Sequence, residues 1–140
     1  VAEHYQRQRR VEEWVGVAKQ ARDTWNIRTF YCDPSEPDYI RQFREAGLHA
    51  EQANNAVNTG LQAVKNRLVV QGDGRPRLTV SADCVYTIAE FESYQWAENR
   101  QGMKDQPVKA NDHCMDALRY AVMGVDAGRK PIEVKTSRWA

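Results

Sequence analysis

The chain has 140 residues, of which 41% are hydrophobic and 28% are charged, so its composition indicates one globular domain rather than a disordered segment. The formal net charge is +1, so any surface for a polyanion has to be local, as in the basic runs QRQRR and GDGRPR, and such runs are more often plain solvated surface. The three cysteines show no CxxC spacing, which argues against a disulfide framework and a structural zinc site and fits a cytoplasmic protein. No apolar run approaches the roughly 18 residues of a membrane helix, which argues against a membrane partner.

The first third of the chain is predicted to alternate strands and helices. VAEHYQ alternates weakly, which favours a short strand over residues 1–6. Apolar residues at helical spacing predict an amphipathic helix over residues 10–25. IRTFYCD, residues 27–33, is a compact apolar run that ends at an Asp-Pro pair, which is typical of a strand.

Two further helices are predicted in the middle of the chain. Ser35 is a suitable N-cap, Asp38 follows three residues later, and Gly47 is placed to end the helix. The next helix is indicated by one apolar stripe, formed by Val57, Leu61, Val64 and Leu68.

The last third continues the alternation. RLTVS predicts a short strand at 77–81, and a helix is expected over 82–94. Residues 94–110 read as a short strand and a loop, and a final helix is expected over 112–122. Residues 124–140 show no periodicity and are expected to form a loosely structured tail.

This order of elements predicts an α/β domain with a mostly parallel or mixed sheet. Only three or four short strands are present, which is few for a sheet covered on both faces. The sequence also starts at Val1, in mid-pattern and without a start Met. We therefore expect the chain to be a piece of something longer.

Several chemistry-bearing residues gather at one strand end and on one helix face. Asp33 follows a predicted strand, at the carboxyl end where ligands collect in α/β sheets. Asp116 lies on the last predicted helix. Residues at helical spacing from Asp116 share its face: Asp112, His113, Arg119 and Tyr120.

Two carboxylates from a strand end and a facing helix suit Mg²⁺ or Mn²⁺, which prefer oxygen ligands. Plainer roles are open from spacing alone. Asp33 can begin a turn, Asp112 can favour a helix start, and Asp116 can pair with Arg119 on the surface. His113 can be an ordinary half-buried histidine.

Four segments taken together carry a family resemblance: FYCDPSEPDYIRQFREAG, NTGLQAVKNRL, IAEFESYQW and PVKANDHCMDALRYAV. In this order they resemble the C-terminal nuclease domain of the large terminase subunit of tailed bacteriophages, the motor that packages DNA. The resemblance covers about residues 3–123. It implies an RNase H-like mixed sheet flanked by helices, over a domain at 1–123 that is incomplete at its N-terminus.

The resemblance also implies an activity and its residues. The family cuts double-stranded DNA concatemers with acidic residues and two divalent metal ions, Mg²⁺ or Mn²⁺. Asp33 and Asp116 match two of the catalytic acids. The implied metal ligands are Asp33, Asp112, His113 and Asp116. The implied contacts to DNA are Lys65, Lys109 and Arg119.

The chain departs from the family pattern at its start. The family's first catalytic Asp lies in a GxDxG-like segment that this sequence does not contain, and Glu3 is not expected to replace it. There is no GxxxxGK[ST] motif, so no ATP site is expected. We therefore expect this chain alone to assemble an incomplete metal site.

Two kinds of function are open at this point. The first is a piece of a terminase nuclease, working in the bacterial host cytoplasm on double-stranded DNA, with the portal and the small terminase subunit as partners of the parent complex. The second is a catalytically inactive remnant that serves as a DNA-binding or assembly module. Another RNase H-like enzyme, such as a transposase or resolvase, fits the fold but matches DHCMDALRY less well. Exposed strand edges predict self-association in each case.

Overall fold

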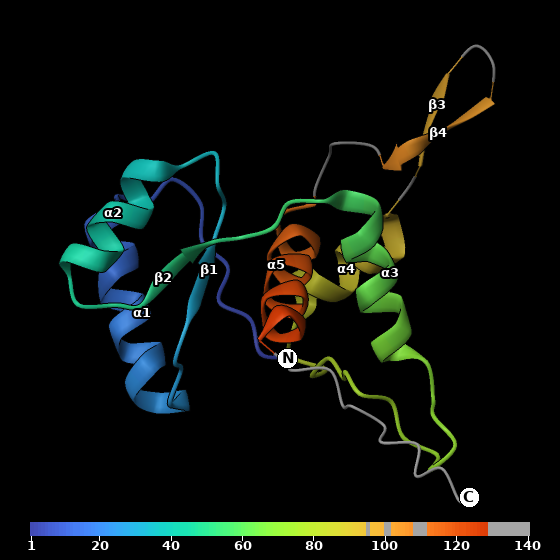
Figure 1. Cartoon of the computed structure of the whole chain (residues 1–140), viewed down its shortest axis with the longest axis horizontal. Coiled ribbons are helices and arrows are strands. Elements are labelled where there is room, and N and C mark those ends of the chain that lie inside the picture. Colours follow the sequence, from blue (N-terminus) through green and yellow to red (C-terminus); the bar gives the residue numbers. More distant parts are fainter. Residues whose placement is uncertain (95, 100–101, 108–111, 129–140) are drawn as a thin grey trace, which may run out of the picture.

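The computed structural model describes residues 1–94, 96–99, 102–107 and 112–128, and these contain five helices and four strands. The helices are α1 (Val11–Trp25), α2 (Pro37–Glu45), α3 (Val57–Leu68), α4 (Val85–Ser93) and α5 (His113–Ala127). The strands are β1 (Phe30–Cys32), β2 (Ala50–Gln52), β3 (Trp96–Asn99) and β4 (Gly102–Pro107). In Figure 1 the elements α1, α2, β1 and β2 form one half of the molecule and α3, α4 and α5 form the other, from which the β3–β4 hairpin projects.

The first half is a two-stranded parallel sheet with two helices beside it. β1 pairs with β2 in a register that places Phe30 opposite Ala50 and Cys32 opposite Gln52. Pro37 occupies the first turn of α2, where its missing N–H costs nothing, and Gly47 ends the helix in a left-handed conformation with φ of 82°. The buried apolar residues of this half are Val11, Ala18, Ile40, Leu48, Ala50 and Ala53.

The second half is built around the parallel pair α3 and α5. Val64 of α3 packs with Leu118 and Val122 of α5 to form the buried cluster of this half. At the carboxyl ends of the two helices, Arg67 forms an ion pair with Asp126. The two helices lie close together because α3 carries a glycine, Gly60, where it crosses α5. The two helices are therefore in contact from Gly60 to Arg67 of α3.

The two halves meet where β1 lies on α5. A Cβ atom at Gly124 would overlap the ring of Tyr31, so only glycine leaves room for this ring on the helix surface. Tyr31 precedes Asp33 by two residues. The contact therefore sets where the end of β1 lies relative to α5.

Two of the predicted strands are absent. Residues 1–6 and 77–81 join through only a single step of parallel pairing. In that step Val1 N donates to Thr79 O (2.7 Å), and Ser81 N donates to Val1 O (3.2 Å). A strand needs a longer ladder, so the sequence prediction was wrong for both segments. Conversely β2 and β4 were missed, because three residues are too few for a convincing alternation and β4 contains Gly102 and Pro107 at its ends.

The α/β class is confirmed, although the predicted mixed sheet is divided into two two-stranded sheets in the part of the chain that the structure describes. The predicted helices are all present, with shifted ends. The helix expected from Ser35 starts at Pro37, and α5 continues through Ala127, into the expected tail. Residues 129–140 lie outside the described residues. None of the described helices combines the length and the apolar character needed to cross a membrane.

We predict that Gly124→Ala lowers the free energy of unfolding, because the added methyl group displaces Tyr31 from α5. The overpacking penalty of about 1–3 kcal/mol exceeds the gain of about 1 kcal/mol in helix propensity. Gly16→Ala is the matched control, because Gly16 lies in α1 with no atom within 4 Å of the new Cβ. Urea denaturation followed by circular dichroism should show Gly16→Ala at or above wild-type stability, and equal stability of the two variants would refute the close contact.

Candidate functional site

Asp33 and Asp116 come from different halves of the molecule, whose contact is made by β1 and α5. Asp33 directly follows β1 and is exposed, and its Oδ1 accepts the N–H of Ser35 at 2.8 Å, which turns the chain toward α2. Asp116 lies in the first turn of α5, and Asp112 is the buried residue just before that helix. The strand-end and helix-face positions predicted from the sequence are therefore correct for both acids.

The phenol of Tyr120 shows that these acids share one neighbourhood. Burial raises the pKa of Tyr120, and the negative charges of Asp33, Asp116 and Asp112 raise it further, while Arg119 lowers it. All three carboxylates thus act on the same hydroxyl group, which lies on the 7% exposed side chain of Tyr120. Helical spacing in the sequence placed Tyr120 on the same helix face as Asp116, but the sequence assigned no role to Tyr120.

A second tyrosine that sequence analysis missed lies next to the same acids. Tyr94 follows α4, and its hydroxyl is buried without a hydrogen-bond partner among the described residues. Burial raises the pKa of Tyr94, Arg119 lowers it, and Asp116 and Asp112 raise it. Only the packing of α4 against α5 brings this side chain to the acids, so no local signal in the sequence could have identified it.

Arg119 is an internal residue. Its side chain is 3% exposed and its Nη2 donates to Asp116 Oδ1 at 2.5 Å. Its Nη1 lies 3.3 Å from the carbonyl oxygen of Ala56, just before α3, and its stem lies against Gly60. The buried guanidinium therefore holds the Asp116 carboxylate to α3, and in this conformation it is not placed where a DNA phosphate could reach it.

Of the two lysines expected to contact DNA, the structure describes only Lys65, and it is not brought to Asp116. Lys65 is exposed on α3. Because α3 and α5 run parallel and Gly60 lies level with Arg119, Lys65 lies toward the Asp126 end of the pair, away from Asp116. Lys109 lies outside the described residues.

The first turn of α5 is held by a carboxylate from a neighbouring helix. Glu90 of α4 is 6% exposed and its Oε2 accepts the N–H of Met115 at 2.9 Å. Cys114 directly precedes Met115. The pKa of its thiol is raised to about 11, mainly by burial and next by the charge of Glu90. Such a thiol is almost fully protonated at neutral pH, so Cys114 fills space here and is not a nucleophile.

α4 is held in the same way by the N-terminal segment. The carboxylate of Glu3 accepts hydrogen bonds from the backbone N–H of Tyr86 (3.0 Å) and Thr87 (2.9 Å) and from the Thr87 hydroxyl (2.7 Å). Burial opposes the charged form of Glu3, but these bonds prevail and the net pKa is lowered. Glu3 therefore fixes the start of α4.

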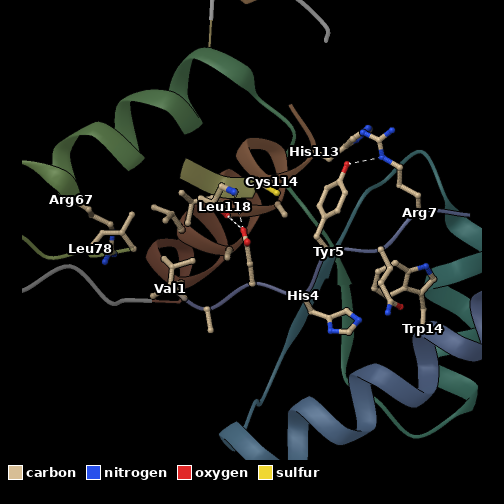
Figure 2. Close-up of a pocket in the computed structure, with 18 of the residues that line it drawn as sticks. Val1, His4, Tyr5, Arg7, Trp14, Arg67, Leu78, His113, Cys114 and Leu118 are labelled. Carbon is tan, nitrogen blue, oxygen red and sulfur yellow. Dashed lines mark hydrogen bonds between the residues drawn. The ribbon is translucent and has the colours of Figure 1, made fainter. Parts of the chain in front are cut away.

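A cavity of about 1030 Å³ lies between the N-terminal segment and α5 (Figure 2). Its walls include Tyr5 and Arg7 on one side and Cys114, Leu118 and Val122 of α5 on the other. His113 lies at this cavity, close to Tyr5 and Arg7 in Figure 2. The first residue of α5 therefore forms part of the cavity wall together with the N-terminal segment.

The described residues do not complete a metal site. No three of the described His, Cys, Asp and Glu residues are grouped so that they could hold an ion. One oxygen of Asp116 is held by Arg119, and one oxygen of Asp33 is held by the Ser35 N–H. The donor chemistry of the two acids suits a divalent cation, but the number of converging ligands does not.

Comparison with known proteins gives a consistent result. A family model for the terminase RNase H-like domain matches residues 5–123. The large terminase of a thermophilic bacteriophage superposes with a TM-score of 0.70 and 27% identity, over 84% of this chain and 30% of that one. Its complex with ATP-gamma-S gives a TM-score of 0.63 at 28% identity, over 82% of this chain and 29% of that one. Its complex with ADP gives a TM-score of 0.62 at 26% identity, over 86% of this chain and 30% of that one. No curated protein matches. The chain therefore spans about 30% of the length of these terminases.

We predict that Glu3→Gln lowers the free energy of unfolding at pH 7 by about 1 kcal/mol, the usual value of a helix cap. Because folding lowers the pKa of Glu3 below 4.5, the charged carboxylate stabilises the fold fully above that pH. The difference between wild type and Glu3→Gln should stay constant from pH 7 to about pH 5 and shrink as the pH falls further. Glu92→Gln, at the exposed far end of α4, is the control, and thermal melts at each pH provide the measurement.

We predict that Arg119→Met lowers the free energy of unfolding by about 3–5 kcal/mol, because it leaves the half-buried Asp116 carboxylate without its cation. Combining it with Asp116→Asn should recover part of the loss, and the double-mutant cycle in urea measures that coupling. Arg41→Met removes an exposed ion pair to Glu45 and should cost less than about 1 kcal/mol. Strictly additive losses at Arg119 and Asp116 would contradict the internal clamp.

Proposed function

The chain belongs to the terminase RNase H-like domain family, and we propose that it forms part of a divalent-metal-dependent nuclease that cuts double-stranded DNA during bacteriophage genome packaging. The observation that carries this proposal is that Asp33 follows β1 and Asp116 lies in the first turn of α5, two elements that pack directly on each other. Acids held by a strand end and a facing helix are the arrangement that a metal-dependent phosphodiesterase needs.

In this proposal Asp33 and Asp116 are the metal-binding and catalytic acids, and the cation is Mg²⁺ or Mn²⁺. Asp112 and His113 lie next to them and are proposed as auxiliary ligands. The described residues supply too few converging donors, so a further acidic ligand from outside them has to complete the site. This supports the proposal that the chain supplies some, and not all, of the acidic ligands of the nuclease site.

The partners follow from the same assignment. Double-stranded DNA is the proposed substrate, and the portal and the small terminase subunit are the proposed partners of the complete large terminase. The sequence has no GxxxxGK[ST] motif, so we assign it no ATP site. Among the described residues, the β1–β2 sheet has no third strand on either edge, which supports self-association of this chain through strand pairing.

One observation favours the second candidate, a catalytically inactive DNA-binding or assembly module. The Asp116 carboxylate is bound tightly to the buried Arg119, and a positive charge at that distance opposes the approach of a cation. The two candidates differ in whether metal reaches Asp33 and Asp116 and in whether DNA is then cut.

The first test is paramagnetic broadening of amide resonances by Mn²⁺. We expect signals from residues next to Asp33 and Asp116 to broaden first, and this selective loss to disappear in Asp116→Asn and Asp33→Asn. Asp38→Asn is the control, because Asp38 is an exposed acid in the first turn of α2. Broadening that ignores Asp33 and Asp116 would contradict the proposed metal site.

The second test is nicking of supercoiled plasmid in Mn²⁺ by the same proteins, with EDTA as the blank. Nicking that is lost in Asp116→Asn and retained in Asp38→Asn supports the nuclease. Selective Mn²⁺ binding without nicking supports the inactive module. Nicking that persists in EDTA would contradict both.

A further inference from the structure

An exposed aromatic and cationic stack lies beside the proposed site. The rings of Tyr5 and Tyr86 are stacked, with centroids 4.2 Å apart and planes at 16°. Arg7 Nε donates to the Tyr5 hydroxyl at 3.1 Å, and its guanidinium carbon lies 5.8 Å from the Tyr5 ring centroid. Tyr86 is 50% exposed. We name these three residues the Tyr86 platform.

The platform keeps one aromatic face available. Tyr5 covers one face of the Tyr86 ring, so the exposed half of this side chain lies on the other face and at the edge. The backbone of Tyr86 is fixed, because its N–H is bound by Glu3 at the start of α4. A ring that is backed by a second ring and held by its backbone needs little ordering when a planar group stacks on it.

Arg7 contributes a positive charge to the platform. Within the described residues Arg7 forms no ion pair with a carboxylate, whereas Arg9 is paired with Glu13. Glu3, the acid next in the segment, is already bound by the amides of α4. The guanidinium of Arg7 therefore keeps donors available for an anion.

The position of the platform connects it to the acids. Tyr5, Arg7 and His113 line the same cavity and lie close together in Figure 2. His113 is the first residue of α5, three residues before Asp116. The cavity wall therefore runs from Tyr5 and Arg7 of the platform to the first residue of α5, the helix that carries Asp116.

We propose that the Tyr86 platform binds an unpaired nucleotide of single-stranded DNA, with the base stacked on Tyr86 and a phosphate at Arg7. A free ring face selects an unpaired base, because bases inside a duplex are covered on both faces by their neighbours. The inference rests on the proposed function and deepens it, since it assigns the contact for a frayed or newly cut strand next to the acids. Nothing in it requires a bound metal.

The test is fluorescence anisotropy of a labelled single strand of about 20 nucleotides, a length that exceeds the usual site size, with a blunt duplex in parallel, in EDTA and at several salt concentrations. Tyr86→Ala should weaken single-strand binding by about fivefold or more, whereas Tyr86→Phe, which keeps the ring, should stay within about twofold. Arg7→Gln should weaken binding and reduce the slope of log K against log salt by about 0.7, the value of one phosphate contact.

The matched controls are Tyr39→Ala and Arg41→Gln, exposed residues of the same types on α2. Both should bind single strands as wild type does, and melting curves confirm that the platform variants are folded. Wild-type affinity in Tyr86→Ala and Arg7→Gln, or binding of duplex alone, overturns this inference and leaves the proposed nuclease intact. Binding of neither DNA form overturns both the inference and the proposed substrate.

Discussion

The bond between the Glu90 carboxylate and the backbone N–H of Met115 is the constraint on which the site depends. The first amides of a helix have no partner within the helix and carry a partial positive charge, so a buried carboxylate fixes the position of the helix start. Glu3 does the same for α4, which carries Glu90. The position of His113 and Asp116 is thus inherited from two successive contacts between an acid and a helix start, beginning in the N-terminal segment.

Two glycines complete this arrangement from the other sides. Gly60 leaves room for the stem of Arg119 between α3 and α5, and Gly124 leaves room for the ring of Tyr31. The first allows a buried guanidinium to reach Asp116, and the second allows β1, which ends just before Asp33, to lie on α5. Each acid is therefore positioned by a contact made possible by a missing side chain, and neither contact is visible in the residues next to that acid in sequence.

The sequence predicted the helices well because each has a local cause. Pro37 and Gly47 mark the ends of α2, and the apolar stripe of α3 packs as expected. The expected strand at residues 1–6 failed, because a strand exists only through its partners and one step of pairing is too little. β2 carried a weak signal in the alternation of buried Ala50 with exposed Glu51, over too few residues to decide.

The candidate site was predicted in part for the same reason. Asp33 and Asp116 followed from local position and from the family resemblance, and the structure confirms their places after β1 and in the first turn of α5, while their role as metal ligands stays a prediction. Arg119 was expected to face DNA, because helical spacing says which residues share a face and not which face is buried. Tyr94 reaches the acids only through tertiary packing. Glu90 offered one overlooked signal, since an acid within the apolar run TIAEF has to find a partner inside the protein.

The contact of Tyr31 with Gly124 is also a common reference point for the positions of the two acids. Asp33 lies two residues beyond it along extended chain, about 7 Å, and Asp116 lies eight residues away along α5, about 12 Å. A tilt of α5 by about 10° at this point would therefore move Asp116 by about 2 Å relative to Asp33 while every helix stays intact. Because Glu90 holds the start of α5 and Arg119 holds the same helix to the start of α3, the position of Asp116 depends on those two contacts as much as on the one at Gly124.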